Sequence, residues 1–220
     1  MSGTRRYRLQ CPIARALDVV GDRWTLLILR DLHAGPARFQ ELEAGLGVAT
    51  NLLATRLTDL VEAGLVTKVG DRHSPYALTD VGRSTDRLLW ELAGFGAQLE
   101  RVDDPRPPGN ARVVALPLRM MLESVTTRPD LVVELRIDDD ALTVVSSPTA
   151  VDVVHGRVER PPDLVLVTSY DSFLDAGDGR LSLDDFMSEH VEVLDGVDQV
   201  GVFADLMRSA FGALRPSGAA

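Results

Sequence analysis

A segment rich in proline, glycine and charge, DDPRPPGNAR at residues 103–112, divides this chain of 220 residues into two differently patterned parts. Proline and glycine clusters are typical of linkers, because both residues interrupt helices and strands. Apolar residues before the segment recur at helical spacing, whereas strand patterns alternate with helical ones after it. We therefore predict an α+β protein with one domain at residues 1–103, a linker at 104–110 and a second domain at 111–220.

The net charge of −10 belongs entirely to the second part of the chain. Residues 1–103 carry 13 basic and 13 acidic side chains, while residues 104–220 carry 10 basic and 20 acidic ones. DNA binding needs a local basic face rather than a basic total, so the balanced first part is compatible with DNA. We expect the acidic second part to be repelled by a DNA duplex.

Three further features indicate the cellular compartment. A single cysteine excludes an internal disulfide framework and fits a reducing environment. No apolar run approaches the roughly 18 residues that span a bilayer. The basic N-terminus MSGTRRYRLQ is not followed by an apolar stretch, so it is unlike a secretory signal. We expect a cytoplasmic protein without a membrane partner.

The first part of the chain has a characteristic order of predicted elements. Its apolar periodicity predicts four helices, then two short strands, LVTKV and YAL, and finally a long helix from Asp80 to about Arg101. This order is typical of a winged helix-turn-helix domain that ends in a dimerisation helix. The last helix has more apolar positions than one core needs, which favours a homodimer. Its apolar seam consists of Val81, Leu88, Leu92, Phe95 and Leu99.

Four motifs in this part carry a family resemblance. In order, they are CPIARALDVVGDRWTLLILRDL, GPARFQEL, LLATRLTDLVEAGLV and YALTDVGR, and together they resemble the HxlR family of bacterial transcriptional regulators. The resemblance implies a dimer that binds inverted-repeat operator DNA through its winged helix. Ala49 stands where this family usually has a serine N-cap, so we expect Thr50 to cap the fourth helix. The wing segment GDRHSP is shorter than usual in the family.

The fourth helix is the predicted recognition helix. Its periodicity buries Leu53, Leu57 and Leu60 and places Asn51 and Thr55 on the opposite face, near the end that enters the major groove. Asparagine can form two hydrogen bonds with adenine, and a threonine methyl can contact a thymine methyl. We therefore predict base contacts from Asn51 and Thr55. The alternative is that Thr50 and Asn51 only cap the helix.

Three arginines are candidates for contacts to the DNA backbone. Arg38 begins the third helix, where the helix dipole favours a phosphate, although a solvated surface arginine is the alternative. Arg56 lies on the flank of the fourth helix and could bind a phosphate or form a salt bridge within the fold. Arg72 lies at the wing tip, from which a phosphate or the minor groove could be reached.

Cys11 is a candidate redox sensor. It lies just before the first helix, where free backbone N–H groups and the helix dipole favour a thiolate. Some members of the family resembled here use a cysteine at this position to sense oxidants. A free cysteine is, however, more often a buried small apolar residue, and we favour that interpretation.

The second part of the chain is predicted to form one antiparallel sheet with packed helices. Four strand patterns, LVVELRI, ALTVVSS, AVDVVHGRV and DLVLVTS, follow an apolar helical stretch that Pro117 interrupts. The segment DGRLSLDDFMSEHVEVLDG then resembles sterol-carrier-protein-type lipid-binding domains. This resemblance implies a tunnel between sheet and helices that holds an apolar small-molecule effector, although the same side chains could be ordinary core residues. Its candidate wall residues are Phe173, Phe186, Met187, Phe203, Leu206 and Met207.

Other motifs do not point to metal binding or catalysis. The segment DAGDGRLSLDDF fails as a calcium loop, because aligning Gly179 to the required glycine places Leu174 and Ala176 at ligand positions. The four histidines have no partner at metal-ligand spacing, and neither a nucleophile elbow nor a phosphate loop is present. We expect no metal, no cofactor and no enzymatic activity. The alternatives are a lipid carrier or scaffold whose winged helix binds proteins, and a regulator whose second domain only braces a dimer.

Overall fold

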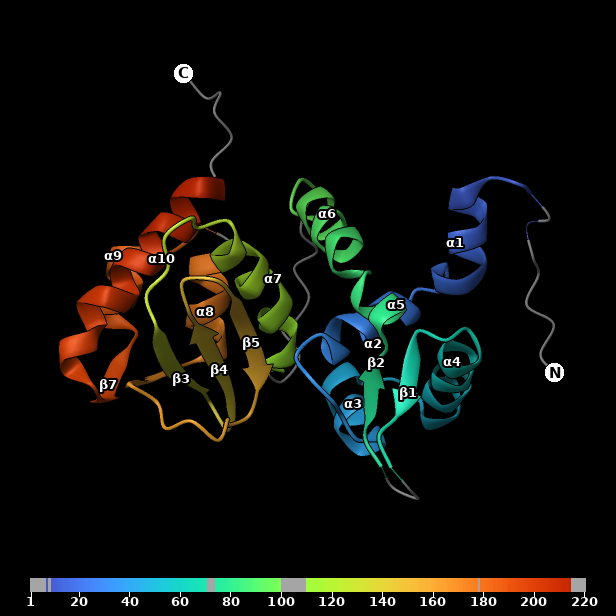
Figure 1. Cartoon of the computed structure of the whole chain (residues 1–220), viewed down its shortest axis with the longest axis horizontal. Helices are drawn as coiled ribbons and strands as arrows, with labels where there is room; N and C mark the ends of the chain where they lie inside the picture. Colours follow the sequence, from blue (N-terminus) through green and yellow to red (C-terminus); the bar gives the residue numbers. More distant parts are fainter. Residues whose placement is uncertain (1–6, 8, 71–73, 100–109, 178, 215–220) are drawn as a thin grey trace. The chain divides into compact units, whose positions relative to one another are not determined.

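The computed structural model describes residues 7, 9–70, 74–99, 110–177 and 179–214 (Figure 1). The chain divides into two compact units, Met1–Glu100 and Arg101–Ala220. No helix within the described ranges is long and apolar enough to cross a membrane.

The first unit contains helices and a two-stranded antiparallel ribbon. Val66 of the first strand lies opposite Leu78 of the second, and Ala37 forms a bridge with Tyr76. This arrangement confirms the predicted winged helix-turn-helix fold. The elements are α1 (Pro12–Val20), α2 (Thr25–Leu32), α3 (Phe39–Leu46), α4 (Thr50–Glu62), β1 (Val66–Lys68), β2 (Tyr76–Leu78), α5 (Asp80–Arg83) and α6 (Asp86–Gly96).

Helices α2, α3 and α4 share one core. The predicted inner face of α4 is confirmed, because Leu53, Leu57 and Leu60 are at most 1% exposed. Ile28 of α2 and Leu42 of α3 are fully buried as well. Burial of each such side chain contributes about 1.5–3 kcal/mol relative to exposure, so this core holds α4 firmly in the unit.

The turn before α4 differs from the sequence prediction. Gly47 ends α3 with a φ of 60°, a left-handed conformation that glycine adopts without strain. Ala49, not Thr50, is the N-cap of α4, and no side chain caps this helix. Thr50 is already helical, and its hydroxyl instead donates to Glu43 Oε1 of α3 at 2.5 Å. The prediction that Thr50 caps the helix is therefore wrong.

The predicted long helix from Asp80 to Arg101 is two helices. Helix α5 ends at Arg83 and α6 begins at Asp86. Between them, the Ser84 hydroxyl donates to the carbonyl of Val81 and the Thr85 hydroxyl donates to that of Gly82, each at 2.7 Å. Such local hydrogen bonds compete with helix continuation, which apolar periodicity does not reveal.

The second unit is a five-stranded sheet with helices. The strand order is β5-β4-β3-β6-β7. The strands are β3 (Leu131–Ile137), β4 (Asp140–Ser146), β5 (Val151–His155), β6 (Leu164–Thr168) and β7 (Glu192–Asp195). The helical elements are α7 (Arg112–Glu123), α8 (Tyr170–Gly177), α9 (Leu183–Glu189), the 3-10 turn η1 (Val197–Gln199) and α10 (Val200–Leu214).

The sheet is mixed rather than antiparallel. Strand β6 pairs parallel to β3, with Val133 opposite Leu164, while the other neighbouring strands are antiparallel. After the edge strand β5, the chain crosses to the far side of β3. Strand β6 therefore lies parallel to β3, whereas in a simple meander it would lie beside β5 and antiparallel to it. The prediction of an antiparallel sheet is therefore wrong for this central pair.

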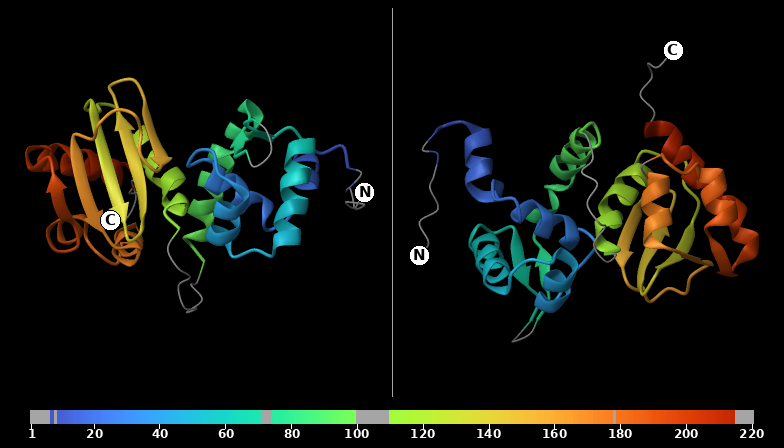
Figure 2. Two further views of the ribbon diagram at one scale, coloured as in Figure 1. Left: turned by 90° about the horizontal axis from the view of Figure 1, so that it is seen from below. Right: turned by 180° about the vertical axis from the view of Figure 1, so that it is seen from behind.

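One face of the sheet is covered by helices (Figure 2). Helix α7 packs on β5 and β4, and α10 packs on α7. Every second residue of β3 points to this face, so Val133, Leu135 and Ile137 lie toward the helices, and all three are buried. Val132 and Glu134, which point to the other face, are buried as well. The main core of the second unit therefore lies between the sheet and its helices.

Pro117 does not interrupt its helix, contrary to the prediction. Helix α7 continues from Arg112 to Glu123 with the proline inside it. Proline cannot donate to the carbonyl four residues earlier, which normally weakens a helix. Here Leu116, Leu118 and Leu122 are buried, so packing of the helix against the sheet compensates for the lost hydrogen bond.

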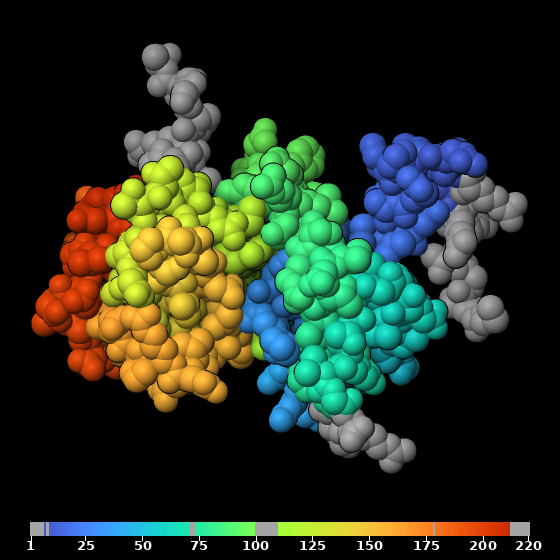
Figure 3. Space-filling model, viewed as in Figure 1, coloured from blue at the N-terminus to red at the C-terminus, as the bar shows by residue number. Residues whose placement is uncertain are grey.

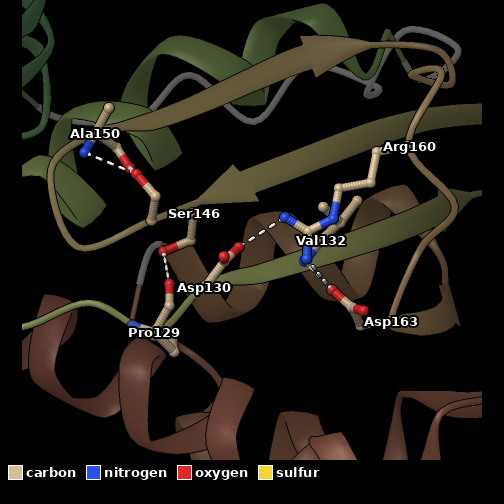
Figure 4. A network of polar contacts seen from close by, with 8 residues as sticks. Pro129, Asp130, Val132, Ser146, Ala150, Arg160 and Asp163 are labelled. Carbon is tan, nitrogen blue, oxygen red and sulfur yellow. Dashed lines mark hydrogen bonds and ion pairs between the residues drawn. The ribbon is translucent and has the colours of Figure 1, made fainter.

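A polar network secures the start of the parallel pair (Figure 4). Asp163, just before β6, donates its backbone N–H to the carbonyl of Val132 in β3, and its carboxylate accepts a hydrogen bond from the Val132 N–H, both at 2.8 Å. Arg160 bridges this carboxylate and that of Asp130, at 3.2 and 2.6 Å. The network therefore sets the register of β6 against β3.

Candidate nucleic-acid interface and ligand pocket

The exposed face of α4 is the candidate DNA-reading surface. Asn51, Thr55 and Thr58 are exposed on the side opposite the leucine core. The Thr55 hydroxyl donates to the carbonyl of Asn51 at 2.9 Å. This hydrogen bond fixes the rotamer of Thr55 and leaves its methyl group available for an apolar contact, while the Asn51 amide is accessible at the start of the helix.

Thr50 and Arg56 make contacts inside the unit. The Thr50 hydroxyl is engaged by Glu43 of α3. Arg56 is 24% exposed, and its guanidinium forms ion pairs with Asp22 at 2.8 Å and Asp59 at 3.0 Å. The structure thus shows the salt bridge within the fold that the sequence left as an alternative for Arg56.

Two other cations are accessible near this surface. Arg38 is exposed at the N-cap of α3, where its backbone N–H donates to Glu41 Oε2 at 2.6 Å. Lys68, which is not among the predicted contact residues, ends β1 with its Nζ atom 5.1 Å from the centre of the Tyr76 ring. Its position as the sole lysine in a predicted wing strand could have indicated it. Arg72 lies outside the described residues.

Helices α1 and α6 expose apolar side chains. Both project from the body of the first unit (Figure 3). Ile13 and Leu17 of α1 are 70% and 43% exposed, and Phe95 of α6 is 58% exposed. Leu88 and Leu92 extend the apolar face of α6. A monomeric protein rarely exposes an apolar surface of this extent without a partner.

Cys11 lies at the N-cap of α1 and is exposed. Its carbonyl accepts a hydrogen bond from the backbone N–H of Arg15 at 3.1 Å. The favoured interpretation of Cys11 as a residue buried within the chain is therefore wrong, and the thiol is accessible to solvent.

A pocket in the second unit lies between the sheet and helices α8, α9 and α10. As it stands, it has room for little more than one water molecule. Phe173 and Phe186 meet edge to face in its wall, with ring centres 5.8 Å apart. Five of the six predicted wall residues, Phe173, Phe186, Met187, Phe203 and Met207, line it, whereas Leu206 is buried but does not. The lining residues that were not predicted are Leu135, Leu166, Thr168, Leu183 and Val191.

The strand residues among these were missed for a physical reason. Strand β6 alternates, so only Leu166 and Thr168 of its second half face the helices. Which of the two alternating faces carries the helices is decided by tertiary packing, not by the strand pattern. Among the described residues, no group of three or more His, Cys, Asp or Glu side chains could hold a metal ion.

The chain is similar to the SCP2 domain of the ubiquinone synthesis protein UbiJ, at 17% identity and a TM-score of 0.30. This similarity covers 46% of the present chain and 80% of the other, and it lies in the C-terminal region.

The first unit matches transcriptional regulators. The profile of the HxlR-like helix-turn-helix family matches residues 19–103. A helix-turn-helix regulator of Mycobacterium tuberculosis is 40% identical over 102 residues, which span 44% of this chain but only 61% of that relative. The regulator YvaP of Bacillus subtilis is 32% identical over 94 residues, which span 40% of this chain and 87% of YvaP. The chain therefore belongs to the HxlR-like helix-turn-helix family of transcriptional regulators.

Proposed function

We propose that two copies of this chain bind an inverted-repeat operator in the cytoplasm, each through the exposed face of α4. The observation that carries this proposal is the division of α4 into a fully buried leucine face and an exposed face bearing Asn51 and Thr55. In a helix-turn-helix protein, the N-terminal residues of this helix contact base edges in the major groove. Arg38 and Lys68 would then bind phosphates beside it.

The test is an operator selected from random DNA with the full-length protein, followed by binding of single variants. Asn51→Ala should weaken operator binding by about five- to a hundredfold, corresponding to the loss of one bidentate base contact. Glu62→Ala, at the far end of the same helix, is the matched control and should leave operator specificity unchanged. Equal affinities of wild type and Asn51→Ala for the selected site would contradict base contact by Asn51.

The homodimer is supported by the apolar faces of α1 and α6. Ile13, Leu17, Leu88, Leu92 and Phe95 are exposed in a single copy, and a second copy would remove them from water. A twofold dimer would also place two α4 helices roughly 34 Å apart, the spacing of successive major grooves. Leu92→Glu should give monomers in sedimentation and abolish cooperative operator binding, whereas Arg87→Glu on the same helix should remain dimeric.

An apolar small molecule in the pocket of the second unit is proposed to modulate DNA binding. The pocket supports this role because apolar side chains from three helices and two strands converge on it. The ligand can act only through different affinities for the DNA-binding and the non-binding arrangements. Native mass spectrometry of the protein from its own host should reveal a dimer with extra mass that leaves on denaturation. A dimer without extra mass would favour a second unit that only braces the dimer.

The carrier or scaffold alternative makes a different prediction about salt. Operator binding through phosphate contacts should weaken steeply as salt rises, because counterions are released from DNA. Protein or lipid contacts need not show this dependence. A salt-independent interaction of the first unit would therefore favour the scaffold.

Cys11 is proposed as an accessible redox site on the strength of its exposure. Mild oxidation should change operator affinity in the wild type but not in Cys11→Ser. An unchanged affinity of the oxidised wild type would remove this role.

A further inference from the structure

Of the described residues that line the pocket of the second unit, one is polar. Thr168, the last residue of β6, is 8% exposed, and the other nine lining residues are apolar. Its Oγ1 atom is buried and makes no hydrogen bond within the part of the chain that the structure describes. A buried hydroxyl without a partner is unfavourable and rare in folded proteins.

Other buried hydroxyls of the same sheet are paired. Thr143 Oγ1 donates to the carbonyl of Gly156 at 2.7 Å, and Ser146 Oγ donates to that of Pro129 at 2.8 Å. Thr168 is thus the exception, and it is also a lining residue of the pocket. The accessible surface of the pocket is wholly apolar as it stands, so the buried hydroxyl of Thr168 meets a ligand only when the wall moves. A valine in its place would have nearly the same shape without the unfavourable oxygen, so the core alone does not explain the hydroxyl.

We propose that Thr168 is the polar anchor of the ligand pocket and hydrogen-bonds a neutral, mainly hydrocarbon molecule that carries one hydroxyl or carbonyl group. This inference rests on the proposed ligand-binding role of the second unit. One side-chain hydroxyl can serve one such group, because it can donate to a carbonyl or exchange a hydrogen bond with a hydroxyl. A carboxylate is disfavoured, since no cationic side chain among the described residues lines the pocket to compensate for its burial.

Ligand binding requires side chains of the pocket wall to move, and two of them are flexible enough to do so. Met187 and Met207 line the pocket from α9 and α10, and methionine side chains are flexible gap-fillers that repack around different ligands. Their displacement would transmit occupancy of the pocket to these two helices. The same methionines provide a local readout of binding.

The experiment uses the full-length protein with ¹³C-labelled methionine methyl groups and three small aromatic probes, each added below its solubility limit. Naphthalene, 2-naphthol and 2-naphthoate share one hydrocarbon frame and differ in their polar group. Ring-current shifts at Met187 and Met207 report binding in the pocket, while Met120 and Met121 of α7, which do not line it, serve as the internal reference. We expect 2-naphthol to bind and 2-naphthoate to bind most weakly.

Thr168→Val tests the anchor, and Thr143→Val, in strand β4 of the same sheet, is its matched control. Thr168→Val should weaken 2-naphthol relative to naphthalene by about two- to tenfold, the range expected for one hydrogen bond. Thr143→Val should leave this ratio unchanged. Without any probe, Thr168→Val should raise the melting temperature, because it removes an unpaired polar atom, whereas Thr143→Val should lower it.

The outcomes distinguish the role of Thr168 from the existence of a ligand pocket. Binding at Met187 and Met207 with the same 2-naphthol preference in Thr168→Val would overturn the anchor and leave the ligand pocket standing. A lower melting temperature of ligand-free Thr168→Val would also overturn the anchor, since the hydroxyl would then be paired. No shift at either methionine with any probe would overturn the pocket, and the anchor with it.

Discussion

Arg56 Nη2 lies 2.8 Å from Asp22 Oδ2, so one ion pair joins helix α4 to the turn before α2. The same guanidinium reaches Asp59 one turn along α4. Asp22 in turn accepts a hydrogen bond from the backbone N–H of Trp24 at 3.0 Å. Arg56 therefore acts as a positioning residue, which aligns α4 with the rest of the helix-turn-helix.

Replacement of Arg56 by methionine should weaken operator binding without changing its salt dependence. The variant loses the ion pairs that orient α4, and these partly exposed pairs contribute about 1 kcal/mol or less to stability. It loses no phosphate contact, so the slope of log K against log salt concentration should equal that of the wild type. Fluorescence anisotropy at several salt concentrations measures both quantities. A shallower slope would instead place Arg56 on a phosphate.

Arg38→Ala, unlike the Arg56 variant, should reduce the salt dependence of DNA binding. Arg38 is exposed at the start of α3, where a phosphate would lie close to the helix N-terminus. Its removal should weaken binding to every DNA sequence about equally and reduce the salt slope by about 1. The same anisotropy series with operator and unrelated DNA checks this. A loss confined to the operator would contradict a phosphate contact.

Leu57→Ala should destabilise the first unit by about 2–5 kcal/mol, because it leaves a cavity among fully buried side chains. Thr58→Ala, the next residue on the exposed face, should change the free energy of unfolding by no more than about 0.5 kcal/mol. Denaturant unfolding followed by circular dichroism compares the two variants. Equal effects would mean that the leucine face of α4 is not the core face.

The second unit should lose stability in acid through Asp140. Burial raises the pKa of this carboxyl, but hydrogen bonds with His155 and with the backbone N–H groups of Ala141 and Ala111 outweigh it, so the pKa lies below the ordinary value of 3.8. A lowered pKa contributes stability that is present above pH 3.8 and is lost as the pH falls through the folded value. Asp140→Asn should therefore flatten the loss of stability below about pH 4.

The control for this pH effect is Asp139→Asn, its neighbour in the same turn. This variant removes an adjacent charge but keeps the hydrogen bonds of Asp140, so it should follow the wild-type profile of unfolding free energy against pH. If Asp140→Asn shows the wild-type acid profile as well, the hydrogen bonds of Asp140 do not stabilise its charged form.

The helices of the first unit could be predicted because their burial follows a local period. The spacing of Leu53, Leu57 and Leu60 is enough to define the inner face of α4. The break between α5 and α6 could not be predicted in this way, since it depends on where the hydroxyls of Ser84 and Thr85 turn. The prediction for Cys11 failed for a different reason, because exposure depends on what packs beside a helix end.

The sheet and its pocket were harder to predict. The strand patterns located β3 and β6, but a pattern of alternating residues does not say which strands pair or in which direction. The aromatic and methionine side chains of the pocket could be selected by type, whereas Leu135 and Leu166 resemble any other core residues. Thr168 could not be identified from sequence, since a missing hydrogen bond is a property of the folded surroundings.

The position of β6 in the sequence, after β3, β4 and β5, affects the order in which the second unit folds. Strands β3, β4 and β5 follow one another along the chain and can assemble as a local meander. The parallel partner of β3 begins only at Leu164, and all lining residues of the pocket except Leu135 lie at or beyond Leu166. During synthesis, the helix-turn-helix unit can thus fold on the ribosome well before the pocket of the second unit exists. A nascent chain would therefore complete the pocket last, after its first unit has folded.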